Sequence, residues 1–161
     1  MFEIESPKNT AVAFSPNGEY LAATGEDESV RLWKVNGWQE IICIRHELRH
    51  EPLLGSIAFS PDSRYLATAS YYEKTARVWE VPSGKEVSRI THNDSVMALA
   101  FSPDGKYLAT GSRDGTARLW LWRPEELIEE ACRHLKRNLT MEEWQEYLGN
   151  EPYCKTCPNL P

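Results

Sequence analysis

The chain has 161 residues, of which 41% are hydrophobic, and its 24 Asp and Glu residues outnumber 18 Lys and Arg residues, giving a formal net charge of −6. This length fits one compact domain with a short appendage, and six tryptophans with this hydrophobic content indicate a packed core. The acidic balance argues against nucleic acid and anionic membranes as main partners, and no apolar run approaches the ~18 residues of a membrane span.

The first residues of the chain and its cysteines bear on location. Residues 1–9 contain neither the basic nor the apolar region of a secretory signal. The cysteines lie unevenly in different predicted elements: Cys43, Cys132, Cys154 and Cys157. Both features favour a reducing, cytoplasmic location over a disulfide framework.

The first patterned segment extends to Arg45. Met1–Glu5 alternates apolar and acidic residues, as a short half-buried strand does. From Ala13 to Trp33 the sequence AFSPNGEYLAATGEDESVRLW predicts three short strands, the first two joined by a Ser-Pro-Asn-Gly turn. Asn36 and Gly37 then turn the chain into a fourth strand over residues 38–45.

A second segment repeats the pattern from Ala58 to Trp79, as AFSPDSRYLATASYYEKTARVW. Its second turn is irregular, because residues 71–74 read Tyr-Tyr-Glu-Lys in place of an Asp-Gly turn and add one residue. Residues 82–85 then turn the chain into an outer strand over residues 86–91.

The third segment is the most regular, and it ends differently. An apolar run over 96–101 predicts a buried strand, and residues 102–105 form a Ser-Pro-Asp-Gly turn. A strand over 107–112 and a hairpin at Asp114-Gly115 lead to a third strand over 116–120. After Trp122 the sequence Arg-Pro-Glu-Glu predicts the start of a helix in place of a fourth strand.

Three motifs therefore recur in order: AFSP, YLAT and Asp/Glu-x-Thr/Val-x-Arg-x-Trp, which the first segment varies as AFSP, YLAA and Asp-Glu-Ser-Val-Arg-Leu-Trp. Phe14, Phe59 and Phe101 mark a period of 45 and then 42 residues. A period of about 40–45 residues that carries four strands is typical of a propeller blade. Over residues 5–122 the chain resembles the WD-repeat β-propeller family.

The resemblance implies an all-β fold of four-stranded antiparallel blades in an incomplete β-propeller, at about residues 5–46, 50–91 and 92–122. Residues 1–122 would form this partial propeller and residues 123–161 a helical tail. Three blades are too few for a ring, since propellers typically have four to eight. Either several copies assemble a ring, or the chain is the terminal piece of a longer protein, which the degenerate first blade favours.

The resemblance also implies a buried hydrogen-bond chain in each blade, formed by a His, a Ser or Thr, an Asp and a Trp. Matching residues are His92, Thr110, Asp114 and Trp120 in the third blade, His50, Thr68 and Trp79 in the second, and Asp27 and Trp33 in the first. The first blade departs from the pattern, with Glu5 at the His position and Ala23 at the Ser/Thr position. A structural framework is preferred to a catalytic site, because buried polar groups need partners.

The tail is predicted to be helical. Leu127, Ile128, Ala131 and Leu135 form an apolar stripe on a helix over 124–136, and Thr140 to Glu143 has the form of a capping box that opens a second helix. The run over 125–161 resembles the C-terminal tail of cyanobacterial multidomain WD-repeat proteins. This resemblance implies that the chain ends a longer protein of bacterial signalling type.

The fold points to a protein-interaction or scaffold module without enzymatic activity or cofactor. Its partner is expected to be a protein, and a homo-oligomer that closes the propeller is a further possibility. Tyr, Arg and Met are enriched at interface cores. Motif alignment to exposed loop positions gives Glu26 and Arg113, with Tyr72 at the irregular turn. Met97, near the start of the strand over 96–101, and Tyr71 are further candidates. The alternative is that Tyr71 and Tyr72 only pack the irregular turn.

Two alternatives stay open. Cys154 and Cys157 have the C-x-x-C spacing of half a zinc site or of a redox motif, although no second ligand pair or βαβ context accompanies them. The chain could also be a non-functional remnant of a longer gene.

Overall fold

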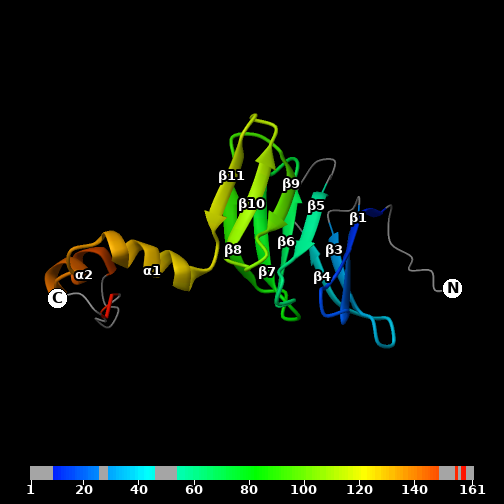
Figure 1. Cartoon of the computed structure of the whole chain (residues 1–161), viewed down its shortest axis with the longest axis horizontal. Helices are drawn as coiled ribbons and strands as arrows, with labels where there is room; N and C mark the ends of the chain where they lie inside the picture. The colour runs from blue at the N-terminus through cyan, green and yellow to red at the C-terminus, as the bar shows by residue number, and fades with distance from the viewer. Residues whose placement is uncertain (1–8, 26–28, 46–53, 149–154, 156, 159–161) are drawn as a thin grey trace. The chain divides into compact units, whose positions relative to one another are not determined.

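The computed structural model describes residues 9–25, 29–45, 54–148, 155, 157 and 158. The chain divides into two compact units, Met1–Trp122 and Arg123–Pro161. The first unit is built of β-strands and the second contains the helices (Figure 1).

The described part of the first unit contains three antiparallel sheets in chain order. The first and middle sheets have four strands each, and the third sheet has three, in agreement with the predicted all-β, incomplete propeller. The strands are β1 (Asn9–Phe14), β2 (Tyr20–Gly25), β3 (Ser29–Lys34) and β4 (Gln39–Arg45); β5 (Leu54–Phe59), β6 (Tyr65–Ser70), β7 (Thr75–Glu80) and β8 (Glu86–Thr91); and β9 (Val96–Phe101), β10 (Tyr107–Ser112) and β11 (Ala117–Leu121).

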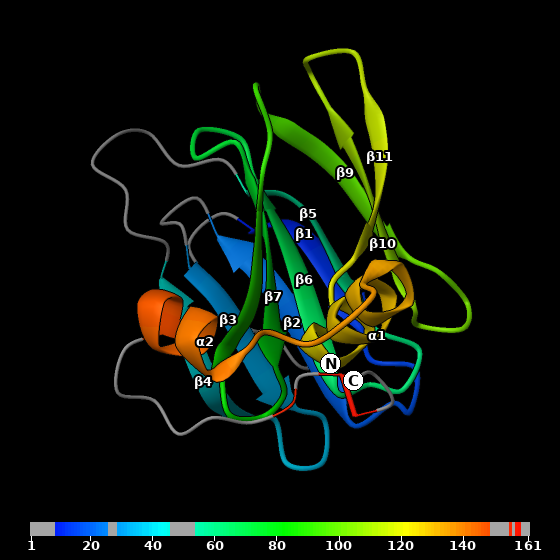
Figure 2. The same cartoon turned by 90° about the vertical axis from the view of Figure 1, so that its left-hand side faces the viewer.

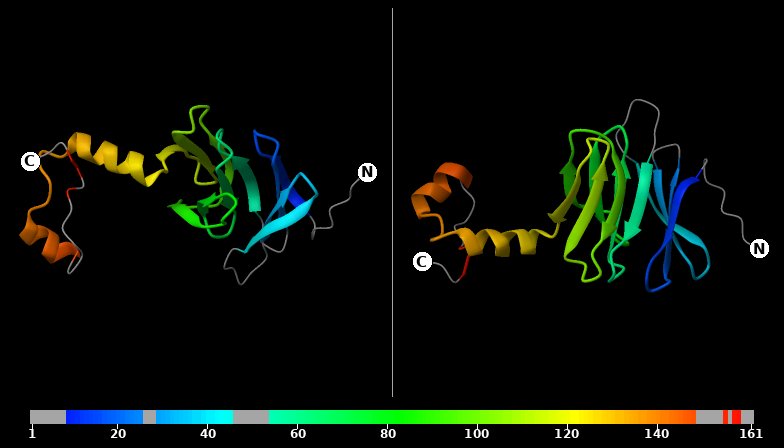
Figure 3. Two further views of the ribbon diagram at one scale, coloured as in Figure 1. Left: turned by 90° about the horizontal axis from the view of Figure 1, so that it is seen from below. Right: turned by 45° about the horizontal axis from the view of Figure 1, so that its top comes forward.

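The sheets stand side by side, with the middle one between the other two (Figure 3). Their first strands are neighbours, since β5 contacts both β1 and β9 (Figure 2). Met1–Glu5, predicted as a further strand, lies outside the described residues.

The same turn joins the first two strands of every sheet. In the first, the Ser15 hydroxyl accepts a hydrogen bond from Tyr20 N at 2.9 Å, and in the middle sheet Ser60 accepts one from Tyr65 N at 3.0 Å. The fourth turn residue has a positive φ of 72° at Gly18, 71° at Gly105 and 60° at Ser63. Glycine adopts this region without steric cost, so the repeated Pro-x-Gly sequence specifies the turn.

Each sheet has two faces. We call the face of the middle sheet toward the first sheet its front and the opposite face its rear, and we use the same names for the equivalent faces of the other two sheets. The front face of the middle sheet includes Phe59 and Leu66, which pack against Ala22, Val30 and Leu32 of the first sheet. Its rear face carries Ala67, Ala69, Ala76 and Val78, which pack against Val96, Leu108 and Trp122 of the third sheet. The middle sheet is thus covered on both faces, and its rear-face residues are fully buried.

The second unit contains α1 (Pro124–His134) and α2 (Met141–Leu148). The predicted capping box opens α2, because Thr140 N donates to Glu143 Oε2 at 2.8 Å and Glu143 N donates to Thr140 Oγ1 at 3.2 Å. Hydrogen bonds from Arg137, and then from Thr140, lower the pKa of Glu143 to about 2. Neither helix of the described chain has the length and apolar content that crossing a bilayer requires.

The structure corrects the interpretation of the cysteines. Cys132 and Cys157 form a disulfide that joins α1 to the end of the chain, whereas Cys43 is free and exposed. Asn138 supports this closure, since its side-chain amide bonds both Cys157 O, at 2.8 Å, and Cys157 N, at 2.9 Å. Spacing alone could not show the pairing, because residues 25 apart in sequence meet only through the turn between the helices.

Candidate protein-binding surface

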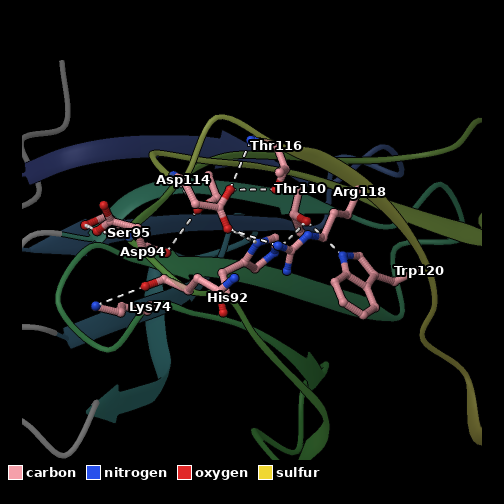
Figure 4. A network of polar contacts seen from close by, with 11 residues as sticks. Lys74, His92, Asp94, Ser95, Thr110, Asp114, Thr116, Arg118 and Trp120 are labelled. Atoms are coloured by element: carbon pink, nitrogen blue, oxygen red, sulfur yellow. Dashed lines mark hydrogen bonds and ion pairs between the residues drawn. The ribbon is translucent and has the colours of Figure 1, made fainter.

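The third sheet holds a buried chain of polar groups (Figure 4). Trp120 Nε1 donates to Thr110 Oγ1 at 2.8 Å, and the same oxygen lies 2.9 Å from His92 Nε2. His92 Nδ1 lies 4.0 Å from Asp114 Oδ2, beyond hydrogen-bond distance. The structure therefore brings together the four third-blade residues that the motif predicts as a hydrogen-bond chain.

The Thr110 hydroxyl accepts from the indole of Trp120 and also bonds His92 Nε2, so it joins the two buried rings. Which of Thr110 and His92 donates in the second bond depends on the tautomer of the imidazole. Because Thr110 is 2% exposed and bonded on both sides, its hydroxyl serves the framework and is not placed as a nucleophile.

The charges around His92 set its protonation. Burial and, after it, the positive charge of Arg118 lower the pKa of His92, although the Asp114 carboxylate acts in the opposite direction. Hydrogen bonds from Thr116 and the nearby Arg118 lower the pKa of Asp114, which stays ionised. Arg118 reaches the same carboxylate at 3.0 Å.

The middle sheet builds a similar arrangement with a different acid. Trp79 Nε1 donates to Thr68 Oγ1 at 2.9 Å. Glu73 takes the role of Asp114, since its Oε2 accepts from Arg77 at 2.6 Å and from Thr75 at 3.1 Å.

Glu73 belongs to the third repeated motif but is absent from the residues predicted to form the hydrogen-bond chain. The signal for it is the spacing, because acid-x-Thr-x-Arg occurs from Glu73 to Arg77 as it does from Asp114 to Arg118. His50, the predicted partner of this group, lies outside the described residues.

The first sheet has fewer of the residues that form this hydrogen-bond chain. Trp33 is buried, but Ala23 provides no hydroxyl at the position of Thr68 and Thr110. Asp27 and Glu26 lie outside the described residues.

Three loops meet at one end of the middle and third sheets, and we call residues 71–74, 92–95 and 112–116 the loop cluster. Backbone hydrogen bonds of 2.8 Å join His92 N to Lys74 O and Arg113 N to Ser95 O. Lys74 Nζ donates to Asn93 O at 3.1 Å, and Ser112 Oγ donates to Asp94 O at 3.1 Å. The loops are therefore fixed to one another across two sheets.

Most of the described binding candidates gather on this cluster. Arg113 donates a hydrogen bond to the Tyr71 hydroxyl and lies 5.9 Å from the centre of its ring. Tyr72 packs edge-on against Tyr71, with ring centres 5.0 Å apart, and remains 42% exposed. Met97, two residues after Ser95, is also exposed. The cluster therefore presents Tyr72 and Arg113 as exposed side chains and Tyr71 as a half-buried one, and Met97, on β9 outside the cluster, adds an exposed methionine.

The structure does not support the cysteine site. Cys157 is bonded to Cys132, so its sulfur is not available as a zinc ligand or to a C-x-x-C pair with Cys154, which lies outside the described residues. No group of three or more metal-ligating side chains is found among the residues that the structure describes.

Known sequences and structures resemble the β unit. The family described as "WD domain, G-beta repeat" matches residues 8–34, 42–80 and 84–120. Coronin-7 of Bos taurus is 36% identical over 128 residues, and the Poly(A)+ RNA export protein of Schizosaccharomyces pombe is 32% identical over 124 residues. The alignments cover 74% and 73% of this chain, but only 14% and 35% of those proteins.

A solved structure entitled "Structure of U3-55K" superposes with a TM-score of 0.66 at 24% identity. It covers 74% of this chain, and this chain covers 37% of it. The two named sequence relatives are eukaryotic and give no support to the resemblance of residues 125–161 to cyanobacterial proteins.

Thr110→Val is expected to lower the free energy of unfolding by about 1–3 kcal/mol, because an isosteric methyl group leaves Trp120 Nε1 and His92 Nε2 without their shared partner. Chemical denaturation measures this loss. Thr110→Ser keeps the hydroxyl and should lose less, and Thr91→Val, at an exposed position in β8, should change stability by less than about 0.5 kcal/mol. Equal losses for Thr110→Val and Thr110→Ser would show that the hydroxyl has no structural role.

The lowered pKa of His92 predicts a pH dependence of stability. The unfolded chain takes up this proton near the ordinary pKa of 6.5, before the folded chain does. Stability from this group is therefore complete above pH 6.5 and is lost as pH falls from there toward the folded pKa.

Melting temperatures measured from pH 8 to pH 5 test this dependence. The unmodified chain should lose stability below pH 6.5, and His92→Gln, which does not titrate, should lose less over the same interval. The other three histidines are present in both proteins, so the difference isolates His92. Identical pH profiles would contradict the assignment.

Proposed function

Because the chain belongs to the WD domain, G-beta repeat family, we propose that it is a protein-interaction scaffold that binds its partner through the loop cluster. Proteins with these repeats generally act as protein-interaction scaffolds, and their propellers are typically non-enzymatic. For this chain we likewise propose binding without catalysis and without a cofactor.

The observation that carries the proposal is the fixed, exposed surface of the loop cluster. Tyr72, Met97 and Arg113 are exposed, although the loops beneath them are joined by backbone hydrogen bonds. A surface that is ordered before binding loses little conformational entropy when a partner docks. Tyr and Arg are also the residues that most often carry binding energy at protein interfaces.

A second part of the proposal concerns the type of protein to which this scaffold belongs and the compartment in which it acts. We propose a bacterial signalling-type protein acting in the cytoplasm, supported by the motif resemblance of residues 125–161. The Cys132–Cys157 bond counts against a reducing compartment, where disulfides are rare.

The double variant Tyr72→Ala with Arg113→Ala tests the proposed surface. It should reduce the capture of protein partners from a lysate of the source cells at least tenfold, because it removes exposed aromatic area and a charge-bearing donor. Quantitative mass spectrometry of the captured proteins measures the effect, and the melting temperature should change little.

Arg89→Ala is the matched control, since the Arg89 side chain is 53% exposed but belongs to β8, outside the loop cluster. It should leave capture unchanged. A double variant that captures the same proteins as the unmodified chain would contradict the proposal, as would a loss of capture that only follows a loss of stability.

A further inference from the structure

One packing contact occurs twice inside the chain. The rear face of the first sheet packs against the front face of the middle sheet, and the rear face of the middle sheet packs against the front face of the third. The registers are the same in both cases: Ala22 opposes Leu32 as Ala67 opposes Val78, and Phe14 opposes Leu21 as Phe59 opposes Leu66. The chain thus shows by itself what covers each kind of face.

Among the described residues, the rear face of the third sheet is exposed. Ala109 opposes Leu119 there, in the register of Ala67 and Val78. Val78 is fully buried, whereas Leu119 is 73% exposed. The surrounding rear-face residues Ala98, Ala100, Tyr107 and Ala117 are also exposed, so this face is apolar and built from small side chains.

In the described part of the first sheet, the front face is exposed as well. Phe14 occupies the position of Phe59, but it is 61% exposed while Phe59 is 8% exposed. Val12 occupies the position of Ile57 and is exposed as well. The two ends of the β unit therefore present the two halves of a contact that the chain makes twice internally.

The side chains at the edge of this contact also have counterparts on the two exposed faces. Inside the chain, Tyr65 of the middle rear face meets Trp122 edge-on, with ring centres 4.7 Å apart. Tyr107 is the counterpart of Tyr65 on the third sheet and is exposed. Val35 follows Trp33 by two residues, as Trp122 follows Trp120, and would meet Tyr107 from the first sheet of another copy.

We propose that two copies of this chain form a closed ring in which the front face of the first sheet of each copy covers the rear face of the third sheet of the other. Each copy contributes three sheets, so two copies make six, within the four to eight that propellers typically have. One copy alone has too few and three copies have too many. A head-to-tail contact closes into a ring only when its rotation returns to the first copy, and the closure proposed here is supported by the total of six sheets.

The loop cluster is on neither face, so this assembly does not depend on the proposed partner surface. Light scattering of residues 1–161 over a range of concentrations tests the assembly. The expected result is a discrete species of twice the 18.5 kDa chain mass. Leu119→Arg and Phe14→Arg each place a charge in both contacts of the ring, so either variant alone should be monomeric.

Mixing the two variants gives the decisive result. Leu119→Arg keeps an intact front face and Phe14→Arg keeps an intact rear face, so the mixture should form a one-to-one dimer through a single unaltered contact. This recovery also proves that both variants fold. Contacts in which identical patches face each other would not be restored in this way.

Leu127→Arg is the matched control, because Leu127 is 48% exposed but belongs to α1 in the other unit. It should leave the dimer intact. A monomeric unmodified chain, an open-ended polymer, a mixture that stays monomeric, or a dimer abolished by Leu127→Arg would each overturn the proposal.

Discussion

The contact between the rear face of one sheet and the front face of the next is the interaction on which the β unit depends. One repeat cannot bury its own apolar faces, and stacking of neighbouring repeats buries them in a continuous core. Small rear-face alanines let the following sheet approach closely, and Leu66 and Leu108 fill the space between, each at most 1% exposed. Burying such a side chain contributes roughly 1.5–3 kcal/mol, so each sheet is stabilised chiefly by its neighbours.

Polar side chains are buried beside this apolar contact, and they need hydrogen-bond partners there. Thr110 satisfies both Trp120 and His92, and the acid of the following turn holds an arginine and a threonine. The same hydrogen bonds position the turns, so the framework fixes the exposed loop cluster. Recognition and stability are therefore linked through the polar chain, although different residues serve them.

The repeated part of the fold could be predicted closely from sequence. Proline-glycine turns and apolar runs set β9 and β10 at their predicted ends, and the missing fourth strand of the third sheet follows from Pro124 and its acidic neighbours. The helix predicted over 124–136 ends at His134, because the backbone of Leu135 is already extended.

Contacts between residues far apart in the sequence could not be predicted in the same way. The Cys132–Cys157 bond and the placement of Tyr71 against Arg113 arise from folding of distant segments, and the role of Glu73 was hidden by an inserted residue.

The most direct test of mutual support between sheets is amide hydrogen exchange on Leu108→Ala. Leu108 belongs to β10 but packs against the middle sheet, where the truncation leaves a cavity that costs about 2–5 kcal/mol. If sheets depend on their neighbours, amides of β6 and β7 should lose protection together with those of β10. Unchanged protection in β6 and β7, with loss confined to β10 and its own sheet, would contradict this account.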